Sequence, residues 1–270
     1  MNPPFIISPD NTYMWRDATT SRRNLCELLL GDVARHLRPD GWGSMLASWL
    51  HDADGDRAIP VGAWLAGLGC DAWVLRFSSQ DPLSYAHTWL AQTEHSSEGF
   101  SSALDRWLNF YRDQRIDAIA TGAIIVHRRT DTDVHTWVDE MPASPTGRAG
   151  AQIQRAFDQR RRLTRLAAPA DLLDEVFAPM PGTSLDQTLR RQDDAYHPAP
   201  TQLWVQPGLT IGAAVPAVAL PVILELDGRR PLRDLVRIAV DNTGFDADEV
   251  RDKALASSRR LVEFGLVEWR

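Results

Sequence analysis

The chain has 270 residues, a length that allows one large domain or two smaller ones around a substantial core. Hydrophobic residues make up 44% and charged residues 24%, and no apolar run approaches the roughly 20 residues that span a bilayer, so we expect a soluble, cytoplasmic protein. The net charge of −7 is uneven, with twelve basic and nineteen acidic residues in 1–146 and seventeen of each in 147–270, which gives neither part the overall charge of a basic nucleic-acid-binding domain.

The four residues after the first methionine, Asn2, Pro3, Pro4 and Phe5, carry the clearest chemical signal. Asn-Pro-Pro-aromatic resembles the active-site loop of methyltransferases that modify planar nitrogens. Such a nitrogen is a poor nucleophile, and a site that accepts both of its N–H hydrogens favours a pyramidal nitrogen with its lone pair aimed at the methyl group. The Asn2 side-chain oxygen and the Pro3 carbonyl are suitable acceptors, held in place by two prolines. Phe5 offers a flat face for a base or an amide plane. The alternative is a rigid turn without a chemical role.

Helices and strands alternate through the first part of the chain. Apolar side chains at helical spacing predict a helix within residues 19–37, which Pro39 must end. Residues 43–50 are expected to form a buried strand whose uncovered edge promotes association. The same alternation continues with a helix at 60–68, a strand at 70–77, helices near 81–92 and 100–113, and a strand at 116–129. This order predicts an α/β domain. On the apolar faces of the helices at 81–92 and 100–113, the aromatics Trp89, Trp107 and Tyr111 are expected to be core residues, with a cofactor box as the alternative.

A loop rich in Pro, Ser and Gly at residues 141–150 predicts a boundary between two domains, 1–146 and 147–270. The second domain is expected to open with an arginine-rich helix at 150–166. A run of like charges favours a solvated helix face, and a local basic patch is the alternative. The arginines concerned are Arg160, Arg161, Arg162 and Arg165.

After this helix the second domain is expected to continue with an irregular stretch that has many prolines, then strands near 202–206 and 209–225, two helices and a short terminal strand. Asp246 or Asp248 would cap the second helix and Gly265 would end it. Helix, helix and strand at a terminus predict a smaller α+β module that is winged-helix-like. Because the domain has no net positive charge, an interaction or scaffold role is favoured over DNA binding.

Metal and disulfide chemistry are not expected. The two cysteines, Cys26 and Cys70, have no metal-ligand spacing and are expected to be reduced core residues. The seven histidines have no acidic residue at metal-ligand spacing, so we predict no metal site.

The segment NPPFIISP, followed by a helix and then HLRPDGWGSMLASW, resembles class I S-adenosylmethionine-dependent methyltransferases with an Asn-Pro-Pro-Phe motif, of the small-domain, actinobacterial type whose substrate is unassigned. The resemblance is most specific over residues 2–50. It implies that residues 1–146 are the second half of a Rossmann-like catalytic sheet. It also implies that Asn2, Pro3, Pro4 and Phe5 form the catalytic loop for a planar nitrogen of a nucleobase or protein amide, with S-adenosylmethionine as donor and a nucleic acid or protein as substrate.

The family holds its donor on a glycine-rich turn after the first strand, and this sequence has only Gly41-x-Gly43 and Gly67-x-Gly69. Neither is expected to bind a nucleotide, so the cofactor-binding residues are unknown. We therefore expect an N-terminally truncated enzyme. Three alternatives stay open: a longer enzyme, an enzyme completed by a partner chain that supplies the cofactor half, and a non-catalytic binding or interaction protein derived from a methyltransferase.

Overall fold

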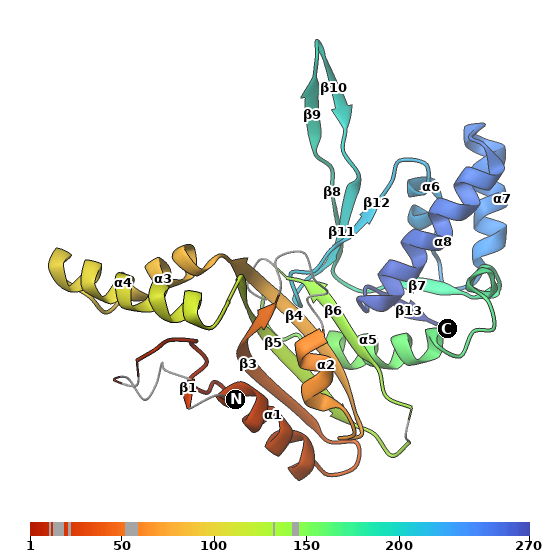
Figure 1. Cartoon of the computed structure of the whole chain (residues 1–270). Coiled ribbons are helices and arrows are strands. Elements are labelled where there is room, and N and C mark those ends of the chain that lie inside the picture. The colour runs from red at the N-terminus through yellow and green to blue at the C-terminus, as the bar shows by residue number, and fades with distance from the viewer. Residues whose placement is uncertain (11, 13–18, 21–22, 52–58, 132, 142–145) are drawn as a thin grey trace. The chain divides into compact units, whose positions relative to one another are not determined.

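The computed structural model describes residues 1–10, 12, 19–20, 23–51, 59–131, 133–141 and 146–270. The chain forms two compact units, Met1–Pro142 and Ala143–Arg270, both built from helices and strands (Figure 1). The boundary loop expected at 141–150 lies partly outside the described residues. Within the described part of the chain, every helix is too short or too polar to cross a membrane.

The first unit is built on a four-stranded sheet in the order β3-β5-β4-β6. β5 runs antiparallel to both β3 and β4, whereas β6 is parallel to β4. Three strands therefore share one direction, and the last long strand returns between two of them. The strand bounds are β3 Trp42–His51, β4 Cys70–Gln80, β5 Ala118–Arg128 and β6 Thr136–Glu140.

Helices α1 and α2 cover one face of this sheet. Alternate residues of β4, such as Cys70, Ala72 and Val74, join a buried cluster with Leu30 of α1 and Val61 of α2. This alternation is what a strand with one face on a helical layer requires. The bounds are α1 Leu25–His36 and α2 Ile59–Leu65.

The first helix begins later than the sequence predicts. Thr19–Thr20 (β1) and Arg23–Asn24 (β2) pair antiparallel, so this backbone is committed to a strand pair and the helix begins at Leu25. The expected helix over 19–37 was therefore wrong at Thr19–Thr20 and Arg23–Asn24. Its end near Pro39 is confirmed.

Helices α3 (Pro82–Leu90) and α4 (Ser97–Asp113) follow the carboxyl end of β4 and pack on each other. Asp81 and Ser96 cap them by accepting from the backbone N–H of Ser84 and Gly99. A second buried cluster forms here from helix aromatics and the N-terminal loop: Tyr85, Leu90, Trp107, Tyr111, Ile6 and Ile7. The expectation that these aromatics are core residues is confirmed for Trp107 and Tyr111.

The second unit combines short strands with helices. Strands β12-β11-β8 form a three-stranded sheet, β9 and β10 extend it as a two-stranded arm, and β13 pairs with β7 (Figure 1). The strand bounds are β7 Phe177–Pro179, β8 Thr183–Asp186, β9 Leu189–Gln192, β10 Ala195–Pro198, β11 Thr201–Val205, β12 Ala213–Val215 and β13 Val267–Trp269. The helix bounds are α5 Gly150–Leu163, η1 Pro169–Asp174, α6 Leu220–Leu224, α7 Leu232–Thr243 and α8 Ala247–Glu263.

The end of the chain confirms the predicted helix, helix and strand. Asp246 caps α8 by accepting from the Glu249 N–H, and Gly265 follows the helix with φ of 63°. The single strand expected over 209–225 was wrong. Only Ala213–Val215 is extended, because Pro216 ends the strand and Pro221 lies in the first turn of α6.

The arginine run on α5 was also misjudged. Arg160 and Arg161 are buried, and Arg160 Nε donates to the Glu263 carbonyl at 2.7 Å. Arg162 lies over the Trp269 ring at 4.0 Å and pairs with Glu175 at 2.9 Å. Arg160 and Arg162 hold α5 to the end of the chain, so these arginines form neither a solvated face nor a basic patch. Arg165, which follows the helix, is exposed as expected.

Candidate functional site

The N-terminal loop joins the sheet beside β3. The Met1 amine donates to the Ser44 carbonyl at 2.7 Å, and the Leu46 N–H donates to the Met1 carbonyl at 3.2 Å. Met1 thus bonds to the residues on either side of Met45, and this is the hydrogen-bond pattern of parallel strands. Residues 2–5 therefore continue toward the carboxyl end of β3, where ligands bind in open α/β sheets.

The predicted loop residues differ in exposure. Asn2 is exposed, Pro3 is buried, and Pro4 and Phe5 are half-buried. Phe5 packs against both core clusters and meets the Trp89 ring edge-on, with centroids 6.0 Å apart. Within the described part of the chain, neither the Asn2 amide nor the Pro3 carbonyl has a hydrogen-bond partner. The two predicted acceptors are thus uncommitted.

Two buried tyrosines fix the backbone immediately after the loop. Tyr111 of α4 donates its hydroxyl to the Ile7 carbonyl at 2.7 Å, and the Ile7 N–H donates to the Tyr85 hydroxyl of α3 at 3.3 Å. Burial raises the pKa of Tyr85 to about 12, so its hydroxyl stays protonated at neutral pH. Both polar groups of Ile7 are therefore satisfied in the interior.

A second anchor holds the end of the segment. Asp10 accepts from Arg106 Nε at 2.9 Å and Nη2 at 3.1 Å, and from the Trp107 indole N–H at 2.8 Å. A two-pronged arginine contact fixes the direction of a carboxylate as well as its position. Residues 7 and 10 are thus both fastened to the α3–α4 pair.

A small polar cluster lies beside the Tyr85 hydroxyl. Ser48 of β3 is within 3.1 Å of the Thr121 hydroxyl and 3.4 Å of the Tyr85 hydroxyl. Nearer the strand ends, His51 Nε2 lies 2.8 Å from Ser79 Oγ. None of these residues was singled out from the sequence, and neither were Tyr85 and Asp10. Their only signal was a polar group in a segment expected to be buried.

S-adenosylmethionine does not fit the described glycine turns. A Cβ added at Gly43 would meet Val33 at 2.7 Å and Val126 at 3.1 Å, so this glycine lets β3 pack closely against α1 and faces no ligand. Gly67 and Gly69, with φ of 74° and 63°, shape the turn at the amino end of β4, the wrong end for a ligand in this kind of sheet. We assign no cofactor-binding residue.

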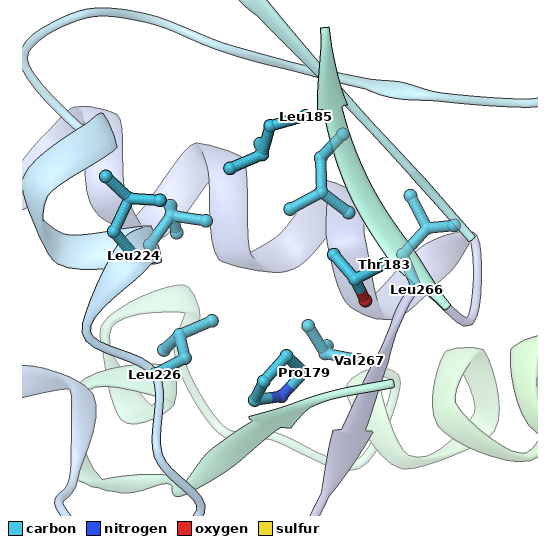
Figure 2. A pocket seen from close by; sticks show the side chains of 9 residues that line it. Pro179, Thr183, Leu185, Leu224, Leu226, Leu266 and Val267 are labelled. Carbon is cyan, nitrogen blue, oxygen red and sulfur yellow. The ribbon is translucent and has the colours of Figure 1, made fainter. Parts of the chain in front are cut away.

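The pocket in Figure 2 belongs to the second unit and is apolar. Its volume is about 100 Å³. Its one polar side chain, Thr183, donates its hydroxyl to the Met180 carbonyl at 2.6 Å, so no group is left for acid or base chemistry. The lining residues are Pro179, Thr183, Leu185, Leu203, Ile223, Leu224, Leu226, Leu266 and Val267. No described group of three or more His, Cys, Asp or Glu residues could hold a metal.

The geometry thus defines a mixed α/β protein with a rigidly anchored N-terminal loop beside the sheet. Comparison with protein-family models and with curated proteins gave no match.

Proposed function

We propose that residues Asn2–Phe5 bind the nitrogen that receives a methyl group in S-adenosylmethionine-dependent N-methylation. The supporting observation is that the acceptor oxygens of Asn2 and Pro3 have no partner among the described residues, while Ile7, two residues after the loop, is fixed at both of its backbone polar groups. Acceptors placed before the substrate arrives need no reorganisation during the reaction, which is how preorganised polar groups lower a barrier.

The order of strands also supports the proposal. A class I methyltransferase sheet ends with a strand that runs antiparallel between the two before it. β5 has this relation to β3 and β4. We also propose that the sheet of the first unit is Rossmann-like and that the end of the second unit is a winged-helix-like module.

In the proposed site, the Asn2 side-chain oxygen and the Pro3 carbonyl accept the two N–H hydrogens of a planar amine or amide. Accepting both favours a pyramidal nitrogen with an available lone pair. The Phe5 ring packs against the plane of the substrate group, and Trp89 holds that ring edge-on. Because the described glycine turns do not fit the methyl donor, the proposal assigns its binding to another segment or a partner chain.

The experiment is methyl incorporation in an extract of the native host from which the gene has been deleted. Purified chain is added with S-adenosylmethionine labelled in its methyl group, and label in macromolecules is counted. We expect incorporation with the wild type and a drop of about tenfold or more with Asn2→Ala, since transition-state hydrogen bonds contribute at least 1.4 kcal/mol each. Asn242→Ala, at an exposed position of α7, is the matched control. Equal incorporation by both variants would refute the proposal.

A second candidate is a non-catalytic interaction protein, and the arm formed by β9 and β10 favours it. Every residue of these two strands is exposed, including Leu189 at 58% and Tyr196 at 68%. Large apolar side chains on a projecting arm are typical of a binding element. In a deletion strain, this role predicts that Asn2→Ala restores the wild-type phenotype and that Leu189→Ser with Tyr196→Ser does not. The opposite pattern would exclude it.

A further inference from the structure

We propose that the nitrogen bound by Asn2–Phe5 belongs to the side-chain amide of a protein, presented by a neutral or cationic polypeptide segment, and not to a base of DNA or RNA. This inference rests on the proposed function of the loop. It is carried by the charges near the loop and by the described arginines of the first unit, most of which already bind oxygen atoms of that unit.

The surface beside the loop is acidic. Arg106 of α4 forms an ion pair with Asp10, and Glu94 is close enough to Arg106 to contribute to its raised pKa, after the larger effect of the Asp10 hydrogen bond. Asp113 is exposed seven residues further along α4, on the same side of the helix as Arg106. From 81 to 117 the chain has six acidic residues and three arginines. A phosphate backbone at the loop would meet net repulsion.

The first unit as a whole repeats this pattern. It has twelve basic and nineteen acidic residues, a net charge of −7. Most of its described arginines are engaged with oxygen atoms of the same unit: Arg35 with Asp32, Arg76 with Glu140, Arg112 with Asn109, Arg128 with the Leu68 carbonyl, and Arg129 with Asp131. Among the described residues of this unit, Arg38 and Arg115 lack such a partner, and two separate cations do not make a phosphate-binding track.

The second unit does not compensate. Its seventeen basic and seventeen acidic residues cancel, and its densest arginine run is used internally by α5. On α7 and α8, the surface arginines are paired with neighbouring aspartates: Arg233 with Asp174, Arg237 with Asp234, and Arg251 with Asp248. Nucleic-acid binding depends on cations that neutralise phosphates. The described exposed cations of this unit for which the structure shows no side-chain partner are spread over separate segments and do not form one run: Arg148, Arg165, Arg190, Arg229 and Lys253.

A protein amide meets the same chemical requirement as a base amine without a phosphate backbone. A glutamine or asparagine side chain is planar, carries two N–H hydrogens for Asn2 and Pro3, and has a flat face for Phe5. Basic residues on either side of that amide would be attracted by Glu94 and Asp113. Charge complementarity of this kind mainly increases the association rate and the selectivity.

The test is fluorescence anisotropy with the full chain at low salt and at about 0.15 M salt. The probes are a fluorescein-labelled peptide with one central glutamine flanked by arginines, the same peptide with leucine at the centre, and labelled single-stranded DNA and RNA. We expect the glutamine peptide to bind most tightly. Asn2→Ala should weaken it by about fivefold, the effect of one lost hydrogen bond, and should leave the leucine peptide unchanged.

Charge reversal supplies a second readout. Glu94→Lys with Asp113→Lys should weaken the cationic peptide by about threefold at low salt, and less at higher salt because exposed charges are screened. Asp194→Lys, on the fully exposed tip of the arm, is the matched control and should have no such effect. An unchanged affinity in the double variant would overturn the electrostatic basis of the inference.

The two proposals fail in different ways. If the oligonucleotides bind in a manner that depends on Asn2 and the glutamine peptide does not, the protein-amide inference is overturned while the acceptor loop stands. If no probe responds to Asn2→Ala, the proposed function of the loop falls and this inference falls with it.

Discussion

Removing the Tyr111 hydroxyl tests whether the candidate loop is held from the α3–α4 pair. In Tyr111→Phe the Ile7 carbonyl loses the hydrogen bond that it accepts at 2.7 Å, while the aromatic ring stays in the cluster. Tyr111 and Ile7 are 1% and 8% exposed, so water cannot readily replace the hydroxyl. A buried acceptor left without a donor costs about 1–3 kcal/mol. This is a noticeable fraction of the roughly 5–15 kcal/mol that stabilises a domain.

Two measurements separate a local from a global effect. Urea unfolding followed by tryptophan fluorescence should show the free energy of unfolding lowered by about 1–3 kcal/mol. Hydrogen exchange of the peptide that covers residues 1–10 should accelerate by about tenfold for each 1.4 kcal/mol lost, because the loop opens more often. Exchange in the second unit should not change.

Tyr196→Phe is the matched control, since this tyrosine is 68% exposed on the arm and lies in the other unit. It should alter neither the unfolding free energy nor the exchange of residues 1–10. If Tyr111→Phe behaves like this control, the tyrosine does not hold the loop and the idea of prepositioned acceptors loses its basis.

Three further predictions concern other parts of the chain. Gly122→Ala should destabilise the first unit by about 3 kcal/mol or more in urea unfolding, because an added Cβ would collide with the Leu75 carbonyl, whereas Gly150→Ala, which meets nothing, should not. Burial raises the pKa of Cys26 to about 11, so a thiol reagent at neutral pH should label it only after unfolding, and stability should fall as pH rises from 9 toward 11. Backbone N–H donors lower the pKa of the Asp227 carboxyl group from 3.8 to about 2. The stabilisation that the charged carboxylate provides is therefore present above pH 3.8 and is lost as the pH falls toward 2, and an NMR titration of Asp227 can follow this change.

The long apolar elements of the first unit could be predicted from the sequence. Residues 43–50, 70–77 and 116–129 are rich in apolar side chains, and all three are confirmed as strands. β6 was missed because its five residues include two acids, and it is extended only through its pairing with β4. No local pattern reports a pairing partner more than sixty residues away.

The arm of the second unit was missed for a different reason. Prolines near 180 and 200 suggested irregular chain, but Pro198 pairs at the end of β10, where a strand tolerates a proline that need not donate. The expected strand over 209–225 failed in the opposite way. The apolar residues of this segment suited a strand or a buried helix equally. Its prolines divide it into a strand, β12, and a helix, α6.

The loop residues themselves could be chosen from the sequence, but the residues that hold them could not. Tyr111 was expected to be a core residue, which is confirmed, yet its hydroxyl bonds to a residue 104 positions earlier in the chain. Helical periodicity places a side chain on a buried face and does not say which backbone group its polar atom will meet there. The sequence therefore predicts the loop residues of the candidate site but not the residues that anchor the loop.

The contacts that anchor the loop bear on the choice between a catalytic loop and a rigid turn. A turn that serves only the fold tends to satisfy its polar groups, because an unmade buried hydrogen bond lowers stability. Here the backbone groups of Met1 and Ile7 are bonded on both sides, while the acceptors of Asn2 and Pro3, between them, have no partner among the described residues. Prolines at positions 3 and 4 also remove the N–H groups that could otherwise bond nearby oxygens. Pro3 is buried, so its open carbonyl favours the proposed ligand-binding loop over a turn that serves only the fold, whereas the exposed Asn2 side chain is open to solvent and fits both.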